Sequence, residues 1–574
     1  MKRFLTIVAL FFALLPLRAQ NATVEVSRPY DVNLDGIRKP AIPTSVDDSL
    51  QRFDVHFDYS IFNRPYSDLY DFTPYESIQL ATVGANRTPF VYARLGAQYA
   101  PRERGVLPAG ELYLQTKPKN GFCSGLYGRH NSFFGQLDPA GTNPLDTRRL
   151  ENTVGGDLTY DWSTGELMLD LQYNFDRFRY ALPGTGRPAA RHANNDVTAS
   201  FNLNSAHKEA NTVYYDVTMA YRNTWKDFLM ENAGDYALDR LPDASIGESL
   251  ISVKGYVGAS FDKHRIYVDM NIEHASYRGI RDFSAGVVEF SPFYQLDIKR
   301  LHARLGVKFG SRYGQEGETA VEDADLSPRS SIFPDVDIRY TLIDKALWIH
   351  TNLTGGNDLN TFSEMVDDCP IVYPGSRMEF GRRPFDATLS LEGVVAGRLG
   401  LNLEGNFRIT RNKMMFTPLA DGMGMTQMTA LYRDVNQYSV QGEVFWKSQD
   451  LAVGGRLRYA GYYDPDDKST VTEMPKWTGY AFFRYNFRER IIAQVECNYR
   501  SATSGQIAEY FDTDVRSFYE VPPIVDVDLN VNYLINNHFS VFAKVGNLLN
   551  HRNQYMPLYL EPGINFGGGV CINF

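Results

Sequence analysis

The C-terminal stretch 525–574 alternates strictly between apolar and polar side chains. From 525 to 535 every odd position is apolar, whereas aspartate or asparagine occupies the even positions from 526 to 532. After a polar turn at 536–538 the alternation resumes over 539–545, and a last alternating run ends at Phe574. A period of two is typical of strands with one apolar and one polar face. The sequence therefore predicts antiparallel strands of this kind up to its last residue.

Similar runs recur along the chain from Pro89 onward. Each is about ten residues long, the length of a tilted strand that crosses a bilayer. Such runs contain Val91, Leu167, Ile266, Leu389, Leu399, Val440 and Ala481. Counting them predicts about 22 strands, an even number as in bacterial outer-membrane barrels.

The connections between these runs alternate in length, which excludes an ordinary soluble sandwich. Short polar turns are expected at 161–165, 262–264, 297–300, 343–345, 397–400, 447–450, 488–490 and 536–538. Long loops are expected at 223–249, 313–330, 356–382, 414–436, 464–475 and 501–523. Short turns on the periplasmic side and long loops on the other are typical of outer-membrane barrels. We therefore predict an all-β, transmembrane antiparallel outer-membrane barrel over residues 89–574.

Composition agrees with this prediction. Aromatic residues make up 13% of the chain, with 36 Tyr and 36 Phe, and mean hydropathy is only -0.33. Barrels need aromatic girdles at both interfaces and are polar on half of each strand. The net charge of -10 argues against a nucleic-acid partner. The ten His are dispersed, and neither H-E-x-x-H nor G-x-S-x-G occurs, so we do not expect an enzyme or a cofactor.

The N-terminal part has a different character. Residues 1–19 have a charged start and an apolar core, which predicts a signal peptide cleaved after Ala19. Residues 20–88 are rich in proline and lack paired alternating runs, so a mostly irregular periplasmic or lumenal segment is expected, with one strand-like piece at 52–61.

The C-terminal end resembles that of TonB-dependent outer-membrane receptors. The resemblance is carried by Asn547-Leu-Leu-Asn550, the loop with Pro562-Gly563, and the terminal Phe574. It implies residence in the cell outer membrane, contact with outer-membrane lipid, and Phe574 as the signal for the barrel-assembly machinery. A weaker resemblance to the TonB box, the strand that receptors offer to TonB, covers Thr23, Val24, Glu25 and Val26. Uptake or passage of solutes is the implied function, with the substrate unknown.

One departure from that family keeps a second hypothesis open. Receptors carry a large plug domain before the barrel, but only residues 20–88 stand in that place here. We expect this segment to cover the periplasmic mouth; otherwise loops such as 356–382, or a partner protein, must close the pore. The alternative hypothesis is a plug-less structural or assembly component that binds other envelope proteins.

The polar faces of the strands supply the candidate site residues. These charges form either a substrate-selective surface or a network that stiffens the wall. They are Arg94, Arg222, Arg304, Arg408, Arg456, Arg458, Arg484, Asp170, Asp216, Asp269, Glu392, Glu404, Glu443 and Glu496.

Two further groups of residues are weaker candidates. The acidic loops at 316–325 and 464–467 are read as solvated rather than Ca²⁺-binding, because neither follows an EF-hand spacing. The four cysteines, Cys123, Cys369, Cys497 and Cys571, lack metal-binding spacing and are read as small filler residues, with a single disulfide as the alternative.

Overall fold

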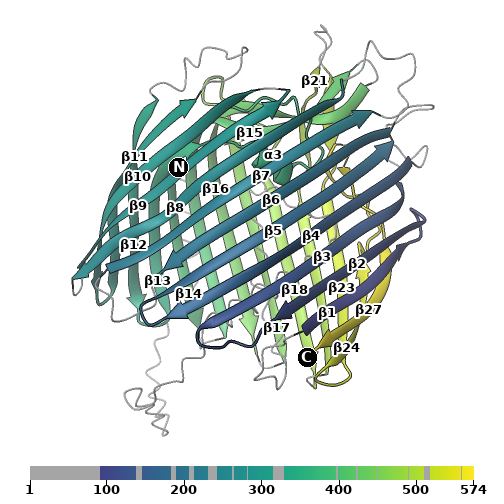
Figure 1. The fold of residues 1–574 in the computed structure, drawn as a ribbon, viewed down its shortest axis with the longest axis horizontal. Helices are drawn as coiled ribbons and strands as arrows, with labels where there is room; N and C mark the ends of the chain where they lie inside the picture. Colours follow the sequence, from purple (N-terminus) through teal and green to yellow (C-terminus); the bar gives the residue numbers. More distant parts are fainter. Residues whose placement is uncertain are drawn as a thin grey trace, which may run out of the picture. The chain divides into compact units, whose positions relative to one another are not determined.

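The computed structural model describes residues 91–574 except 138–144, 182–188, 206–212, 231–241, 262–263, 281, 315–328, 396–397, 422–423, 449, 489, 510–516 and 558. Within this part, 22 strands form one closed antiparallel wall (Figure 1). They are β1 (Val91–Ala100), β2 (Gly105–Gln115), β3 (Phe122–Leu137), β4 (Leu145–Trp162), β5 (Gly165–Ala181), β6 (Ala189–Asn204), β7 (Val213–Met230), β8 (Ala244–Phe261), β9 (His264–Gly279), β10 (Phe283–Ile298), β11 (Leu301–Gly314), β12 (Ser330–Ile343), β13 (Leu347–Asp358), β14 (Gly381–Val395), β15 (Leu399–Asp421), β16 (Gly424–Lys447), β17 (Leu451–Tyr463), β18 (Trp477–Phe487), β19 (Ile491–Arg500), β23 (Ile524–Leu534), β24 (Phe539–Gly546) and β27 (Asn565–Asn573).

Each wall strand pairs with the next along the chain, and β1 pairs with β27 to close the cylinder. The backbone of Val91 completes this seam, since its N–H donates to the carbonyl of Phe574 (3.1 Å) and its carbonyl accepts from the N–H of Phe574 (2.9 Å). The lumen-facing ring of Phe542 lies across the seam, directly over Gly96 and Gly569. A Cβ atom at Gly96 would lie 2.6 Å from this ring, and one at Gly569 would lie 2.7 Å from it, so the ring fits because both residues are glycine. The predicted fold class and strand number are confirmed.

Six shorter elements lie in the connections. They are the helix α3 (Phe362–Asp368) and the strands β20 (Thr503–Gln506), β21 (Ala508–Glu509), β22 (Phe518–Val521), β25 (Gln554–Met556) and β26 (Tyr559–Leu560). β21 pairs in parallel with two residues of β15, and β20–β22 and β25–β26 form small separate sheets. In the described residues, no helix is long and apolar enough to span a membrane.

The predicted short turns all join neighbouring strands at one end of the barrel, here called the turn end; the opposite end is the loop end. Two predicted loops are wrong in extent. Residues 414–436 lie mostly in the hairpin of β15 and β16, and 223–249 include the ends of β7 and β8. Backbone hydrogen bonds continue the ladder of these strands where the side chains no longer alternate, so their full length could not be predicted from a period of two.

The alternation separates two faces of the wall. Outward side chains include Leu95, Leu126 and Leu171, which are 60%, 62% and 58% exposed. Polar residues between such positions face the lumen, and many are buried there, among them Glu248, Lys226 and Asn194. Wall side chains alone cannot fill a barrel of this many strands. Filling the lumen therefore requires residues outside the wall strands.

Candidate functional site

The connection between β13 and β14, residues 359–380, folds into the lumen and is called the inward loop. Its centre is α3, which begins at Thr361 with a capping box: the Thr361 side chain accepts from the Glu364 N–H, and the Glu364 side chain accepts from the Thr361 N–H. Phe362, Met365 and Val366 are spaced so that they share one helix face, and each is less than 5% exposed. The helix thus presents an apolar face inside the barrel.

That face belongs to an apolar core that lies across the loop end of the lumen. Phe178, Ile246 and Val287 contribute from β5, β8 and β10, and Phe416, Met428 and Ile524 contribute from β15, β16 and β23. The loop between β24 and β27 adds Tyr555, Met556 and Tyr559. The inward loop is therefore packed against several sides of the wall at once.

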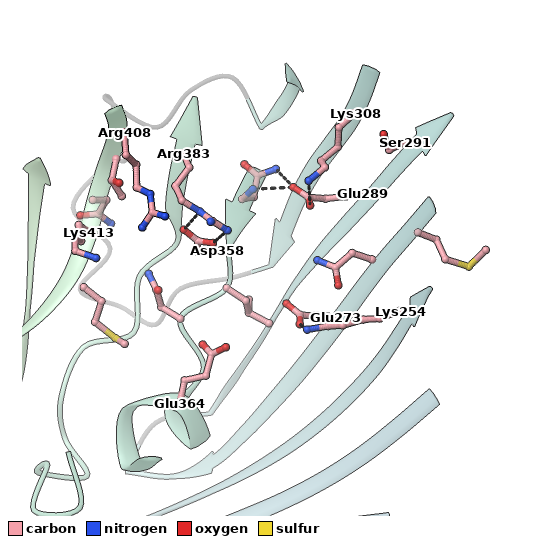
Figure 2. A pocket seen from close by; sticks show the side chains of 18 of the residues that line it. Lys254, Glu273, Glu289, Ser291, Lys308, Asp358, Glu364, Arg383, Arg408 and Lys413 are labelled. Atoms are coloured by element: carbon pink, nitrogen blue, oxygen red, sulfur yellow. Dashed lines mark hydrogen bonds and ion pairs between the residues drawn. The ribbon is translucent and has the colours of Figure 1, made fainter. Parts of the chain in front are cut away.

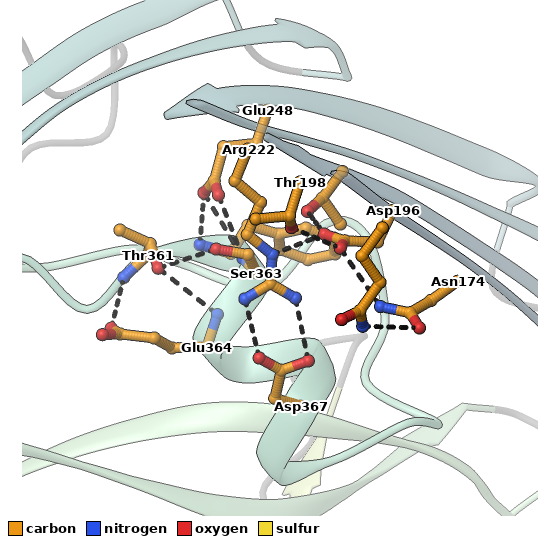
Figure 3. A network of polar contacts seen from close by, with 12 residues as sticks. Asn174, Asp196, Thr198, Arg222, Glu248, Thr361, Ser363, Glu364 and Asp367 are labelled. Atoms are coloured by element: carbon orange, nitrogen blue, oxygen red, sulfur yellow. Dashed lines mark hydrogen bonds and ion pairs between the residues drawn. The ribbon is translucent and has the colours of Figure 1, made fainter. Parts of the chain in front are cut away.

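Buried polar groups of the wall hold the ends of α3 (Figure 3). The carboxylate of Glu248, which is fully buried on β8, accepts hydrogen bonds from the N–H groups of Phe362 (2.6 Å) and Ser363 (3.3 Å). These N–H groups have no partner within a helix, so a carboxylate at this place satisfies them and complements the helix dipole. Figure 3 shows Glu248 reaching α3 from the strand.

Two basic side chains of β7 hold the C-terminal half of the helix and the residues after it. Arg222 on β7 donates to both carboxylate oxygens of Asp367, at 2.7 and 2.9 Å, and its Nε also contacts Asp196. Lys226 lies four residues further along β7, on the same face of the strand, and is fully buried. It donates to the carbonyl of Pro370 (2.6 Å) and to Asn194 (2.7 Å). The wall therefore holds the inward loop through the charge-assisted hydrogen bonds of Arg222, a stronger kind than those between neutral groups, and through the buried amine of Lys226.

The loop between β24 and β27 is tied down by the motif that carried the family resemblance. The Asn547 side chain donates to the carbonyls of His551 (2.7 Å) and Pro562 (3.1 Å) and accepts from the His551 N–H (3.0 Å). Asn550 accepts from the Ile564 N–H (3.0 Å). Arg500 on β19 donates to the carbonyl of Tyr555 (2.5 Å), which directs this loop into the lumen beside the inward loop.

A polar cavity of about 500 Å³ lies beside the inward loop (Figure 2). Its lining carries both signs of charge, from Lys254, Lys308, Arg383, Arg408 and Lys413 and from Asp269, Glu273, Glu289, Asp358, Glu364, Asp367 and Asp368. Several of these side chains form ion pairs with each other: Lys254 lies 2.5 Å from Glu273, and Arg383 lies 2.8 Å from Asp358. No aromatic ring lines this cavity among the described residues. The cavity therefore suits a polar solute rather than an apolar one.

Glu364 connects this cavity to the helix cap. Desolvation inside the barrel, together with the negative charges of Glu273, Asp358 and Glu248, raises the pKa of Glu364 to about 7. The hydrogen bond from the Thr361 N–H opposes that rise. Near neutral pH the carboxyl of Glu364 is consequently divided between its two protonation states.

The charges singled out from the sequence lie in several places. Arg222 grips the inward loop, and Asp269 and Arg408 line the cavity. Arg304 lies 3.2 Å from Asp269 and 2.6 Å from Asp335, and Arg408 lies 2.7 Å from Asp386. Only this group is brought near the inward loop.

The remaining predicted charges lie elsewhere on the wall. Four of them have a side-chain partner: Arg94 lies over the ring of Phe542 (4.0 Å), Asp170 accepts from Tyr127 (3.2 Å), Asp216 accepts from Asn202 (2.8 Å), and Glu392 lies 3.7 Å from Arg339. The others are placed by strand register: Glu443 lies opposite Arg456, and both Glu404 and Arg458 lie opposite Gln441. Arg484 and Glu496 lie on the neighbouring strands β18 and β19. These contacts join wall strands that are adjacent or one strand apart.

Sequence reasoning missed Glu248, Lys226, Asp196 and Asp367. A signal for the inward loop was nevertheless present, because Thr361-x-x-Glu364 is a capping-box pattern and Phe362, Met365 and Val366 are unusually apolar for a surface loop. The TonB-box-like residues 23–26 and the whole segment 20–88 lie outside the described residues, as do the acidic residues at 316–325. Their roles stay predictions.

The other weak candidates have structural surroundings. Asp464 and Asp467 accept the N–H groups of Asp466 (2.9 Å) and Ser469 (2.7 Å) within one turn. No group of three or more metal-ligating side chains is found in the part of the chain that the structure describes. All four cysteines are free thiols, and Cys369 is buried in the inward loop against Met556.

Comparisons with known proteins identify the fold. No protein-family description and no curated sequence match the chain. Solved structures match: the FrpB iron transporter from Neisseria meningitidis has 11% identity and a TM-score of 0.60 over 86% of this chain and 82% of its own. The copper transporter OprC has 11% identity and a TM-score of 0.61 over 84% and 80%. A ferric enterobactin receptor (PfeA) mutant from Pseudomonas aeruginosa has 12% identity and a TM-score of 0.59 over 84% and 80%.

Proposed function

Because the chain has the 22-strand barrel fold of the TonB-dependent receptors, we propose that it resides in the cell outer membrane and takes part in the uptake or passage of polar solutes. The fold itself was expected from the sequence. The structural neighbours are named as transporters or receptors of iron, copper and a ferric siderophore, which favours passage over the alternative of a structural or assembly component. In an outer-membrane barrel the short turns face the periplasm, so the turn end is the periplasmic end and the loop end is the extracellular end.

The observation that carries the proposal is the inward loop with its polar cavity. A barrel of this width would otherwise leave a water-filled hole. Here an apolar core built on α3 lies across the loop end, and a cavity of about 500 Å³ with both signs of charge lies beside it. A protein that holds its own loop across one end of the lumen, and keeps a polar cavity at that loop, is suited to controlled passage.

In the proposed mechanism the inward loop is the gate. The core around Phe362 and Met365 excludes water, while Glu248, Arg222 and Lys226 fix the position of α3. A solute that enters the cavity meets side chains that already belong to the gate, among them Glu364 and Asp367. Binding energy gained only when the loop has moved would shift the equilibrium toward an open lumen.

Single-channel conductance of the purified protein in planar bilayers tests this proposal. Replacing 360–380 by a short Gly-Ser linker should convert a closed or weakly conducting barrel into one with a large, stable conductance. Replacing 465–470, an exposed connection at the same end, should leave conductance at the wild-type level. Equal conductance of the two folded variants would refute the gate. If the linker variant also passes small solutes into liposomes no faster than wild type, the uptake proposal fails as well.

A further inference from the structure

The barrel wall is incomplete between β12 and β13 at the loop end. β12 pairs with β11 from its first residue, Ser311↔Ser330, to Leu301↔Tyr340. Its pairing with β13 covers only Val336↔Leu353 to Ile343↔Leu347. Residues 330–335 of β12 therefore form a strand edge without a partner from β13.

The end of β13 leaves the wall because it turns into the lumen. Asn357 donates from its N–H to Glu289 on β10 (2.7 Å), and Lys308 on β11 donates to the carbonyl of Gly355 (2.9 Å). Gly310 makes this crossing possible, because a Cβ there would lie 2.5 Å from the Asn357 side chain and 3.0 Å from the ring of Phe333. The same contacts that deliver the inward loop to the lumen thus open the wall behind it.

A groove of about 840 Å³ lies at this opening. Its lining is mainly apolar and includes Phe290, Phe309 and Ile332, which are 42%, 49% and 70% exposed and so lie on the outward face. Arg382 on β14 also lines it, whereas the next residue, Arg383, faces the lumen and pairs with Asp358. Within the described residues Arg382 has no ion pair or hydrogen-bond partner, and its Nε is buried.

The strand edge, the apolar lining and Arg382 together favour a lipid as the molecule that binds in this groove. An unpaired strand edge is not stable in bare hydrocarbon, so ester and phosphate oxygens or water must satisfy its N–H groups. Pro334 removes one N–H from this edge, which disfavours pairing with a strand of another protein. Outward apolar side chains suit an acyl chain, and an arginine without a partner suits a phosphate. Arg329, which is exposed just before Ser330, adds a second positive charge next to the groove.

We propose that the groove between β12 and β14 binds a phosphorylated lipid of the surrounding outer leaflet, with an acyl chain on Phe290, Phe309 and Ile332 and the phosphate on Arg382. This site lies on the opposite side of the wall from the polar cavity. The inference requires that the barrel lies in a bilayer, but it does not depend on solute passage. A lipid in this groove would seal the wall where β13 has left it.

Native mass spectrometry of the purified full-length barrel with dioleoyl phosphatidic acid tests the proposal. Arg382→Gln should lower the occupancy of this lipid roughly tenfold, since a charge-assisted hydrogen bond is lost, and Arg382→Lys should restore part of it. Arg278→Gln, which removes an exposed arginine at the loop end of β9, is the matched control and should bind like wild type. Dioleoylglycerol, which lacks the phosphate, should bind weakly and equally to wild type and Arg382→Gln.

A second pair of variants tests the apolar part of the groove, where the acyl chain is proposed to bind. Ile332→Asn should weaken both lipids, whereas Ile280→Asn, at another exposed isoleucine of the loop end, should weaken neither. Heat-modifiability on gels confirms that each variant is folded. Equal binding by wild type, Arg382→Gln and Arg278→Gln would overturn the proposal. So would displacement of the lipid by glycerol 3-phosphate at equal concentration, which would indicate a site for free phosphate. A mass of two barrels without lipid would instead assign the edge to a second copy of the chain.

Discussion

The guanidinium of Arg222 and the carboxylate of Asp367 form a bidentate ion pair, with N–O distances of 2.7 and 2.9 Å, between a wall strand and a helix that lies 145 residues further along the chain. Arg222 is mostly buried and also contacts Asp196, so the wall side of this pair is rigidly placed. Asp367 is half exposed, on the free side of α3. The pair therefore joins a fixed wall to the part of the chain that must move if the lumen opens.

Asp367→Asn should loosen the inward loop without unfolding the barrel. The charge-assisted pair is worth roughly 1 to 3 kcal/mol, so we expect the open fraction in single-channel recordings to rise by about tenfold or more. Asp344→Asn breaks an exposed pair with Arg300 (3.1 Å) at the turn end and serves as the control. Unchanged gating in Asp367→Asn would show that this pair does not hold the gate.

Glu248→Ala should release the N-terminus of α3. The N–H groups of Phe362 and Ser363 would lose their buried acceptor, at a cost of roughly 1 to 3 kcal/mol. Hydrogen exchange of the amides in 360–372 should therefore become faster by one to two orders of magnitude. Glu392→Ala removes a lumenal carboxylate that lies near Arg339, away from the inward loop, and exchange in 360–372 should then stay at the wild-type rate.

Docking of the inward loop should weaken as the pH rises. The pKa of Glu364 is raised to about 7 from an ordinary value of 4.5, first by burial and then by Glu273, Asp358 and Glu248. The docked loop holds this proton more tightly than the released loop, so the stabilisation is fully present below about pH 4.5 and is lost as the pH passes through about 7. Conductance should accordingly increase between pH 5 and pH 8. Glu364→Gln keeps a residue suited to the capping box and should remove this dependence. A pH response that persists in Glu364→Gln would assign it to another group.

The two faces of the wall should respond differently to arginine. Leu401 is outward and 42% exposed, so Leu401→Arg should destabilise the barrel by roughly 2 to 4 kcal/mol if the position is near the middle of the bilayer. Asn402 faces the lumen opposite Glu443, and Asn402→Arg should be tolerated. Urea unfolding in lipid vesicles measures both. Similar losses at the two positions would contradict the assignment of the faces.

The terminal residue should be required for efficient assembly. The Phe574 backbone closes the seam with Val91, and its ring stacks on His538 (5.0 Å between centroids) and meets Phe539 edge-on (5.7 Å). Phe574→Asp should lower the folded fraction in membranes, as judged by heat-modifiability, whereas Phe574→Tyr keeps the aromatic contacts and should assemble normally. Equal folded amounts would argue against a role for the terminal aromatic.

The barrel was predictable from the sequence for a local reason. Whether a side chain faces lipid or lumen depends on its parity along one strand, so the alternation from Val525 to Ile535 is readable without any partner strand. Turn chemistry at 488–490 or 536–538 is equally local. These signals determined the strand number, the last strand that ends at Phe574, and the two faces. Near the loop end β15 and β16 continue without a regular alternation, and the prediction failed over 414–436.

Only the tertiary structure decided what fills the lumen. The sequence around Thr361 and Glu364 specifies a short capped helix, but its docking depends on Glu248, which is 114 residues away, and on Arg222, which is 145 residues from Asp367. The groove behind β13 likewise exists only because Asn357 reaches Glu289 and leaves β12 unpaired. Contacts of this kind leave no period in the sequence, since they join residues that become neighbours only after the barrel has closed. The sequence therefore determined the wall, and the closed barrel decided the gate, the cavity and the groove.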